Sequence, residues 1–160
     1  MNKNLFIEEV LEAERTLYHV SKTILSKDQD CEDAVQSAIL KAYEKLNTLK
    51  EEQYFKTWLI RILLNECYRI KRKEKPNVPY EECFEFVKAE DKEDYSELYL
   101  AITRLPERIR VTVVLYYVEG YSVKEIKQIL KIPAGTVKSR LAKGRKLLKD
   151  KLEIMEVDYE

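Results

Sequence analysis

The sequence contains few residues of several types, and each scarcity excludes certain folds or kinds of functional site. Only three glycines and four prolines occur among 160 residues, while Leu, Ile, Lys and Glu are abundant, and this composition favours helix throughout. The one histidine, His19, leaves no basis for a His-centred catalytic site. The three cysteines, Cys31, Cys67 and Cys83, are an odd number without paired metal-ligand spacing, so we expect reduced thiols and no metal.

Other absences concern membranes and catalysis. The chain has no long apolar run and no N-terminal secretion signal, so we expect it to stay in the cytoplasm. A nuclease or phosphotransferase would need clustered acids for a metal or a His-based centre, whereas the acids here are scattered along the chain. We therefore predict a binding protein rather than an enzyme, with no cofactor and no small-molecule substrate.

The net charge is zero, but the charges are segregated along the chain. Residues 131–151 carry eight basic side chains and one acid, and residues 56–75 carry seven basic side chains and two acids. Residues 77–100, between these blocks, carry two basic side chains and eight acids. Two basic blocks separated by an acidic one indicate two contacts with a polyanion.

Residues 123–151 predict two helices joined by a tight turn. Ser122 and Glu125 form a capping-box pattern before the first helix, and Pro133 interrupts the chain before a second helix that starts near Thr136. The apolar residues of the first helix recur at helical spacing: Val123, Ile126, Ile129 and Leu130. The pattern is that of a helix-turn-helix, whose second helix enters the major groove of DNA.

An ordinary surface hairpin with a solvated lysine face is the alternative for this segment. Val137, Leu141 and Gly144 lie on the inner side of the second helix, and Gly144 is expected to let the two helices approach closely. The turn and the one-sided charge favour a DNA-binding role over the solvated hairpin.

Before this segment, apolar spacing predicts a further inner stripe that includes Val118, with Tyr116 in the core and Tyr117 at its edge.

Residues 54–73 interleave aromatic side chains with cations and become strongly basic at their C-terminal end. Single-stranded nucleic acid is bound in this way, because bases stack on aromatic rings while cations follow the backbone. Phe55 and Leu59 are expected in the core. Trp58, the only tryptophan, fits either the core or a stacking role.

Three stretches resemble one protein family. The LPER opening at Leu105 and the later LYYVEGYS, KEI and GTVKSRL resemble the fourth region of bacterial sigma factors of the extracytoplasmic-function (ECF) group. The FxTWLxRIxxN pattern that begins at Phe55 and the segment around residues 28–46 resemble the second region. The resemblance covers residues 5–72 and 98–149.

The resemblance implies an all-α fold with two small helical domains. Residues 1–75 would form the second-region bundle, which binds core RNA polymerase and recognises and melts the minus-ten element. Residues 76–95 would be a flexible acidic linker, and residues 96–152 the helix-turn-helix domain that recognises the minus-thirty-five element. Residues 153–160 lie outside the resemblance, and their acidic composition predicts a frayed tail.

The resemblance also implies which residues touch DNA. For the minus-ten element, Trp58 would stabilise the melted strand, Asn65 would read an extruded base, and four cations would hold phosphates: Arg61, Arg69, Lys71 and Arg72. For the minus-thirty-five element, the side chains expected at base edges are Lys138, Ser139, Ala142 and Lys143. Those expected at phosphates are Thr136, Arg140 and Arg145.

The partners implied are core RNA polymerase, promoter DNA and an anti-sigma factor. The polymerase contacts would be with the coiled coil of the largest subunit and with the flap region. The residues implied for the coiled coil are Glu32, Asp33, Gln36 and Lys41, although their outward face also fits a merely solvated surface. The anti-sigma factor would inhibit the protein and is often membrane-anchored in this group. The chain departs from the family at Ser37, where glutamate is usual, and at Lys127 and Lys131, where alanine and glycine are usual.

A free-standing helix-turn-helix repressor or activator is the competing function. It would use residues 105–149 to bind duplex DNA and the N-terminal part to dimerise. The charged helix at residues 54–73 argues against this function, because a dimer interface should not carry so many cations. Promoter-specific initiation with purified core polymerase separates the two functions.

Overall fold

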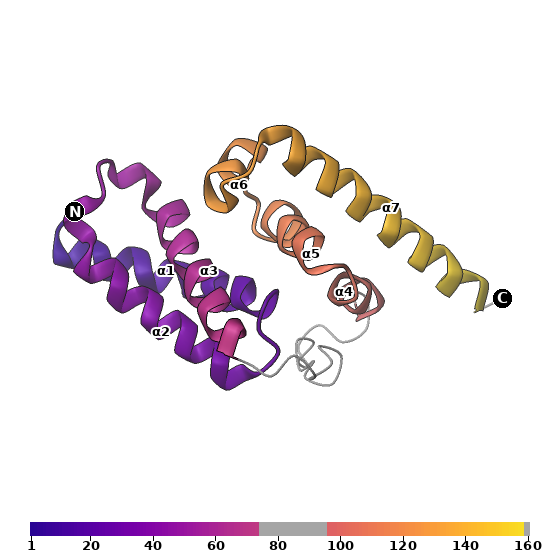
Figure 1. Ribbon diagram of the computed structural model, residues 1–160, viewed down its shortest axis with the longest axis horizontal. Helices are drawn as coiled ribbons and strands as arrows, with labels where there is room; N and C mark the ends of the chain where they lie inside the picture. Colours follow the sequence, from indigo (N-terminus) through magenta and orange to yellow (C-terminus); the bar gives the residue numbers. More distant parts are fainter. Residues whose placement is uncertain (74–95, 159–160) are drawn as a thin grey trace. The chain divides into compact units, whose positions relative to one another are not determined.

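The computed structural model describes residues 1–73 and 96–158, and these parts contain no β-strand (Figure 1). The chain divides into two compact units, one built on α1–α3 and one on α4, α5, α7 and most of α6. The helices are α1 (Lys3–Lys22), α2 (Asp28–Glu44), α3 (Phe55–Lys73), α4 (Ser96–Thr103), α5 (Glu107–Val113), α6 (Val123–Leu130) and α7 (Ala134–Asp158). The predicted all-α class is confirmed. The predicted linker, residues 76–95, lies outside the described residues.

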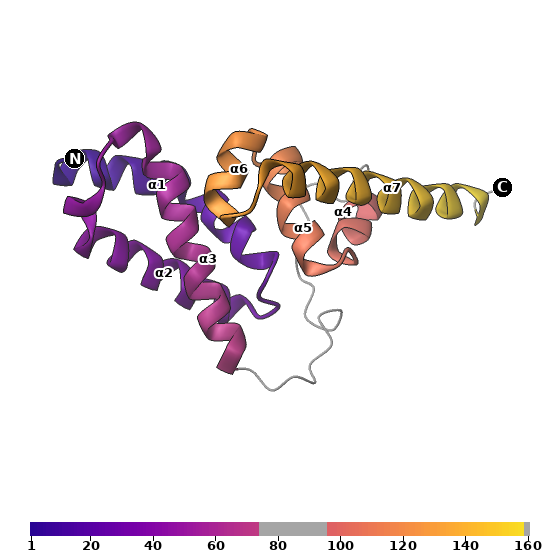
Figure 2. The ribbon, with the colours of Figure 1, turned by 45° about the horizontal axis from the view of Figure 1, so that its top comes forward.

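In the first unit, α1, α2 and α3 each pack against the other two (Figure 2). Their buried side chains recur at steps of three and four: Leu17, Val20, Ala34, Ala38, Ala42, Phe55, Leu59 and Leu63. The three alanines of α2 are small, so neighbouring helices approach this helix closely. This packing turns the polar side of α2 and the cationic side of α3 toward solvent.

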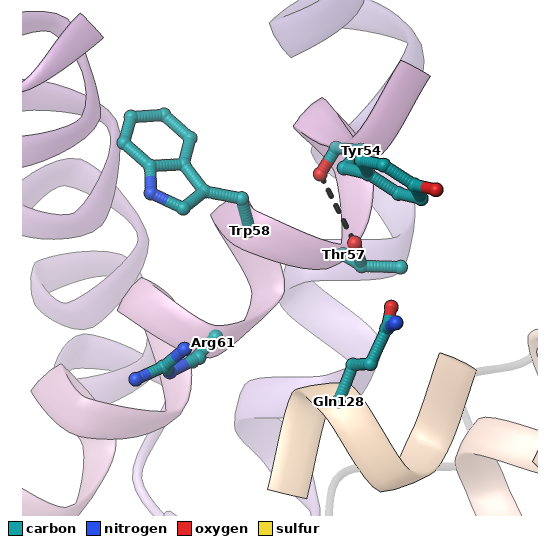
Figure 3. Close-up of a pocket in the computed structure, with 5 residues that line it drawn as sticks. All are labelled: Tyr54, Thr57, Trp58, Arg61 and Gln128. Carbon is teal, nitrogen blue, oxygen red and sulfur yellow. Dashed lines mark hydrogen bonds between the residues drawn. The ribbon is translucent and has the colours of Figure 1, made fainter. Parts of the chain in front are cut away.

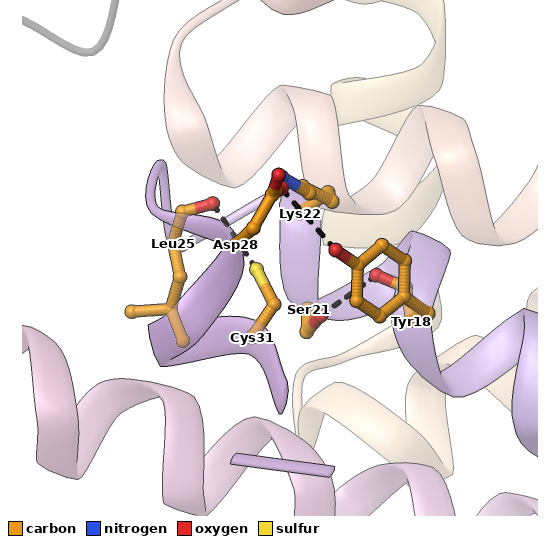
Figure 4. Close-up of polar contacts among 6 residues, drawn as sticks. All are labelled: Tyr18, Ser21, Lys22, Leu25, Asp28 and Cys31. Atoms are coloured by element: carbon orange, nitrogen blue, oxygen red, sulfur yellow. Dashed lines mark hydrogen bonds and ion pairs between the residues drawn. The ribbon is translucent and has the colours of Figure 1, made fainter. Parts of the chain in front are cut away.

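An ion pair between a buried lysine and a half-buried aspartate fixes the corner between α1 and α2 (Figure 4). The ammonium of Lys22, a residue only 5% exposed, pairs with the carboxylate of Asp28 at the start of α2. The hydroxyl of Tyr18 donates to Asp28 Oδ1 at 3.2 Å. Since a buried cation is stable only beside a compensating anion, these contacts hold the first turn of α2 in place.

Cys31 and Cys67 are buried free thiols in this unit. Burial raises the pKa of both, and the thiol of Cys31 lies 3.6 Å from the carbonyl oxygen of Leu25, to which it donates (Figure 4). A protonated, buried thiol is a poor nucleophile, so both cysteines act as small core residues. Cys83 lies outside the described residues.

Close contact between α5 and α7 organises the second unit. A Cβ atom added at Gly144 would lie 2.6 Å from Val113 Cγ2 and 3.1 Å from Ile109 Cγ2. We expected Gly144 to allow close approach between the two helices of the helix-turn-helix, α6 and α7. This expectation is wrong, because the helix that approaches α7 at Gly144 is α5. The spacing placed Gly144 on the inner face, but only packing determines which helix lies there.

A π-helical turn, η4 (Val114–Val118), follows α5. The amide of Glu119 donates to the carbonyl of Val114 at 3.0 Å, five residues back rather than four. The extra residue changes the phase of the helix, so Val118 is 44% exposed and Tyr116 is 37% exposed. The predictions that Val118 lies inside and Tyr116 in the core are therefore wrong.

The helix-turn-helix has the predicted first helix and cap. The amide of Ser122 donates to Glu125 Oε1 at 3.0 Å, and the amide of Glu125 donates to Ser122 Oγ at 3.1 Å, so the capping box is confirmed. At the other end of α6, Lys131 has φ +55°, and the amide of Ile132 donates to the carbonyl of Lys127 at 3.4 Å. Glycine suits this left-handed position best, which explains why the family usually has glycine where this chain has Lys131.

The second helix, α7, is longer than predicted at both ends. It starts at Ala134 rather than near Thr136, because the carbonyl of Pro133 accepts hydrogen bonds from the amides of Thr136 (3.0 Å) and Val137 (3.1 Å). Helix α7 continues into the predicted acidic tail and ends at Asp158. An i,i+4 ion pair between Lys149 and Glu153, 3.9 Å long, lies where the tail was predicted to begin.

No helix within residues 1–73 and 96–158 combines the length and the apolar character needed to cross a membrane.

Candidate nucleic-acid interface

One stripe on α3 carries most of the side chains predicted for the minus-ten element. At steps of three or four residues it contains Trp58, Arg61, Asn65, Arg69 and Arg72. Asn65 and Arg72 are exposed and the other three are half-buried, whereas Leu59 and Leu63 on the opposite face are buried. Lys71 is exposed but lies to one side of the stripe. The helix thus presents an indole, an amide and three guanidinium groups in one direction.

Trp58 is neither a core residue nor a fully exposed one. Its ring packs at a tilt against the buried Phe55, with 6.0 Å between ring centroids, and the residue is half-buried. Figure 3 shows the side chains of Trp58 and Arg61 projecting from α3. Trp58 directly follows Thr57, whose hydroxyl donates to the Tyr54 carbonyl at 3.0 Å. The contact with Phe55 fixes the ring while part of it stays accessible, so Trp58 lies at the edge of the core.

Glu66 is a buried acid in the middle of this basic helix and was missed by the sequence analysis. It is 3% exposed, its Oε1 pairs with the ammonium of Lys41, and Arg69 Nε donates to its Oε2 at 2.9 Å. Burial alone would raise the pKa of Glu66, but the hydrogen bonds from Lys41 and Arg69 lower it below its ordinary value. The i,i+3 spacing to Arg69 was a readable signal. The pairing with Lys41, on another helix, was not.

Replacing Glu66 by glutamine is expected to lower the free energy of unfolding of the first unit by about 1–2 kcal/mol near pH 7. The glutamine keeps the shape but not the charge, and leaves two cations without their common partner. Since the folded pKa of Glu66 lies below the ordinary value of 4.5, its contribution is complete above that value and is lost as the pH falls through the folded pKa.

Urea denaturation at several pH values checks this prediction. The difference in unfolding free energy between wild type and Glu66→Gln should begin to narrow as the pH falls through about 4.5 and should close as the pH falls through the lower folded pKa of Glu66. Glu44→Gln, at an exposed carboxylate on α2, is the control and should change little. A gap that stays constant with pH would contradict the role given to Glu66.

Three of the four α2 side chains predicted to bind polymerase are exposed to solvent. Glu32, Asp33 and Gln36 are exposed, and the amide of Gln29 donates to Asp33 Oδ1 at 3.0 Å. Lys41, the fourth predicted residue, is half-buried and pairs with Glu66 on α3. The structure therefore groups the first three side chains on solvent-facing turns and gives Lys41 a contact inside the unit.

The side chains predicted for the minus-thirty-five element lie along the first three turns of α7. Lys138, Ser139, Ala142, Lys143 and Arg145 are exposed, while Thr136 and Arg140 are half-buried. The buried side of the helix is formed by Val137, Leu141 and Gly144. Arg145 Nη1 donates to the Tyr117 hydroxyl oxygen at 3.0 Å, a contact that the sequence analysis did not foresee.

The described residues contain no group of three or more His, Cys, Asp or Glu side chains that could hold a metal ion. The two cationic surfaces are instead suited to binding a polyanion: α3 combines its cations with an aromatic ring and an amide, and α7 presents cations on a regular helix. The first set suits unstacked bases, and the second suits a groove of closed duplex.

Comparison with known proteins identifies the family. Residues 10–76 match the family Sigma-70 region 2, and residues 95–148 match the family Sigma-70, region 4. The chain is 30% identical over 156 residues to the ECF RNA polymerase sigma factor SigW of Bacillus subtilis (strain 168), with 85% of this chain and 82% of SigW covered. It is 31% identical over 134 residues to the ECF RNA polymerase sigma factor SigM of Mycobacterium tuberculosis (strain H37Rv), with 82% of this chain and 68% of SigM covered.

A solved structure agrees with these matches. The sigma factor RpoE from Bartonella quintana, crystallised with the anti-sigma factor NepR, superimposes with a TM-score of 0.76 at 25% identity, covering 93% of this chain and 97% of RpoE. The two matched regions occur in the family's order, and the alignments extend over most of both chains. The chain therefore belongs to the ECF group of sigma-70 RNA polymerase sigma factors, which are transcription initiation factors.

Proposed function

We propose that this sigma factor holds a promoter through two helices with different targets, α7 on closed minus-thirty-five duplex and α3 on the opened minus-ten strand. Residues 96–152 would make the first contact and residues 1–75 the second, joined by residues 76–95. The observation that carries the proposal is the difference between the two cationic surfaces. Only the stripe on α3 includes an accessible indole and an exposed amide, Trp58 and Asn65.

On α3, the proposed roles follow from the chemistry of each side chain. Trp58 offers a ring supported by Phe55 for stacking of an unpaired base. Asn65 presents an exposed amide that both donates and accepts hydrogen bonds, as the Watson–Crick edge of an extruded base requires. The cations that would follow the strand backbone are Arg61, Arg69, Lys71 and Arg72. Opening needs no ATP if base capture offsets unstacking, which requires a few kcal/mol per step.

On α7, the proposed roles separate base edges from phosphates. The exposed Lys138, Ser139, Ala142 and Lys143 lie near the N-terminal end of the helix, the part that reaches base edges in a major groove. Thr136, Arg140 and Arg145 would hold the flanking backbone. Each phosphate contact releases counterions, so binding should weaken steeply with salt.

For core polymerase, we assign the exposed α2 surface formed by Glu32, Asp33 and Gln36 to the coiled coil of the largest subunit. Lys41 is left out because its ammonium pairs with Glu66 and so joins α2 to α3. The second unit would contact the flap region.

Replacing Asp33 by lysine is expected to weaken binding to core polymerase about tenfold, because the reversed charge would face its partner surface with the wrong sign. A fluorescence titration of labelled protein with purified core enzyme measures this affinity. Glu14→Lys reverses an exposed acid on α1 with the same change in net charge and should bind as wild type does. Equal affinities for the two variants would contradict the assignment.

Transcription in vitro tests the function as a whole. Purified protein and core polymerase are given a pool of random-sequence templates, and the 5′ ends of the transcripts are mapped. The expected result is a set of discrete start points preceded by two shared elements, which also supplies the promoter sequence. Start points no different from those of core enzyme alone would overturn the proposal.

Regulation by an anti-sigma factor is part of the proposal. Its support is the likeness to RpoE, which was solved in complex with the anti-sigma factor NepR. Because core polymerase and promoters are cytoplasmic, we infer that this protein acts there, and a membrane-anchored inhibitor would hold it at the inner face of the membrane. The mechanism is binding without catalysis.

A further inference from the structure

The contact between Arg145 and Tyr117 joins the recognition helix to the π-helical turn. Arg145 Nη1 donates to the Tyr117 hydroxyl oxygen at 3.0 Å, and both side chains are exposed, Tyr117 by 50%. Arg145 has five N–H donors, so this bond leaves donors for a ligand. Tyr117 accepts the bond, which leaves its own hydroxyl proton free to be donated to a second acceptor.

Two local features bring these residues together. The π-helical turn η4 (Val114–Val118) rotates Tyr117 outward instead of leaving it in the phase of α5. Gly144, next to Arg145 in sequence, allows α7 to approach Val113, the last residue of α5, more closely than a Cβ would permit. The 3.0 Å contact therefore depends on the tight α5–α7 packing beside it.

Arg145 lies on the same ridge of α7 as side chains proposed to read bases. Lys138, Ala142, Arg145 and Lys149 follow one another at steps of four, three and four residues, and all are exposed. When Lys138 and Ala142 face a groove, Arg145 therefore lies about one turn further along the helix, toward the edge of the duplex. An arginine side chain has many rotamers, and a fixed hydrogen bond reduces the ordering that binding must otherwise impose.

We propose that the Tyr117 hydroxyl positions the Arg145 guanidinium for a backbone phosphate of the minus-thirty-five duplex and donates its own proton to the same phosphodiester. The inference rests on the proposed function of α7. Tyr117 would contribute affinity and no base preference, because its target is a phosphate oxygen.

Closed-complex affinity of the holoenzyme on a duplex probe tests this inference. The probe carries the promoter found by transcript mapping, and binding is measured at low temperature, where strands stay paired. Tyr117→Phe is expected to weaken binding about threefold to tenfold, because it removes the hydrogen bond that orders Arg145 together with the weaker bond that Tyr117 donates to the phosphate. Arg145→Ala should weaken binding further and reduce the magnitude of the salt slope by about 1, the value of one lost phosphate contact.

The double variant Arg145→Ala/Tyr117→Phe provides the decisive measurement. With Arg145 already alanine, Tyr117→Phe should retain only a small residual effect, because its main role acts through Arg145. Tyr116→Phe is the control, because it removes a hydroxyl from the neighbouring tyrosine and should leave DNA affinity unchanged. The Tyr116 ring packs edge-on against the Tyr117 ring, with 4.8 Å between ring centroids. Melting curves for all variants detect any loss of folding.

The outcomes separate the inference from the proposed function. If wild-type binding is insensitive to replacing the minus-thirty-five element, the proposed function fails. If wild-type binding depends on that element but Tyr117→Phe binds as Tyr116→Phe does, only the role of Tyr117 is overturned. Equal effects of Tyr117→Phe with and without Arg145 would also overturn it.

Discussion

Replacing Trp58 by alanine is expected to reduce promoter opening about 5- to 150-fold, the range that corresponds to losing one base–aromatic stack of roughly 1–3 kcal/mol. The indole rests on Phe55 with 6.0 Å between ring centroids, on the same stripe as Asn65 and the arginines. An alanine offers no surface for an unpaired base, while the core polymerase surface on α2 is untouched. Trp58→Ala should therefore reduce promoter opening more than it reduces affinity for core polymerase.

Permanganate footprinting measures opening through the reactivity of thymines in the minus-ten element. Reactivity should fall strongly for Trp58→Ala and recover in part for Trp58→Phe, which restores an aromatic face. Tyr43→Ala removes an aromatic ring from α2, where Tyr43 is 48% exposed, and should open the promoter as wild type does. Unchanged thymine reactivity in Trp58→Ala, at equal core affinity, would contradict the stacking role.

Replacing Gly144 by valine is expected to destabilise the second unit by about 3 kcal/mol through overpacking against α5. A Cβ at this position would already lie 2.6 Å from Val113 Cγ2, and valine adds two further methyl groups. Val113 is β-branched and cannot rotate away easily, so the two helices must separate. Hydrogen–deuterium exchange should show faster exchange in α5 and α7 than in α1–α3.

Two further variants make this result specific. Ala142→Val places the same side chain on an exposed position of α7 and should lose only helix propensity, about 0.5 kcal/mol. Val113→Ala combined with Gly144→Val removes the clashing methyl groups and should be more stable than Gly144→Val alone. No rescue by Val113→Ala would place the source of the destabilisation elsewhere.

Regularities within single helices were predictable because they repeat every three or four residues along the chain. The capping box at Ser122 and Glu125 involves neighbours three residues apart, and both of its hydrogen bonds form. The interleaved aromatic and basic residues of 54–73 likewise predicted the helix whose solvent-facing stripe carries Trp58, Asn65 and the arginines. Such patterns depend on helix geometry alone.

Contacts between helices were not predictable in this way. Helical spacing assigned Tyr116 and Val118 to the interior, but the π-helical turn shifts the phase by one residue and exposes both. Lys41 had the spacing of an outward residue on α2, yet it pairs with Glu66, 25 residues later on α3. Nothing in the local sequence of either helix specifies that partner.

The sequence by itself therefore determined the helices, their polar faces and the two basic blocks, because these follow from the order of side chains along one helix axis. Tertiary structure alone decided that Glu66 pairs with Lys41, that Gly144 makes room for α5, and that Tyr117 meets Arg145. The physical reason is that each of these contacts joins residues on different elements, whose separation is set by the packing of whole helices.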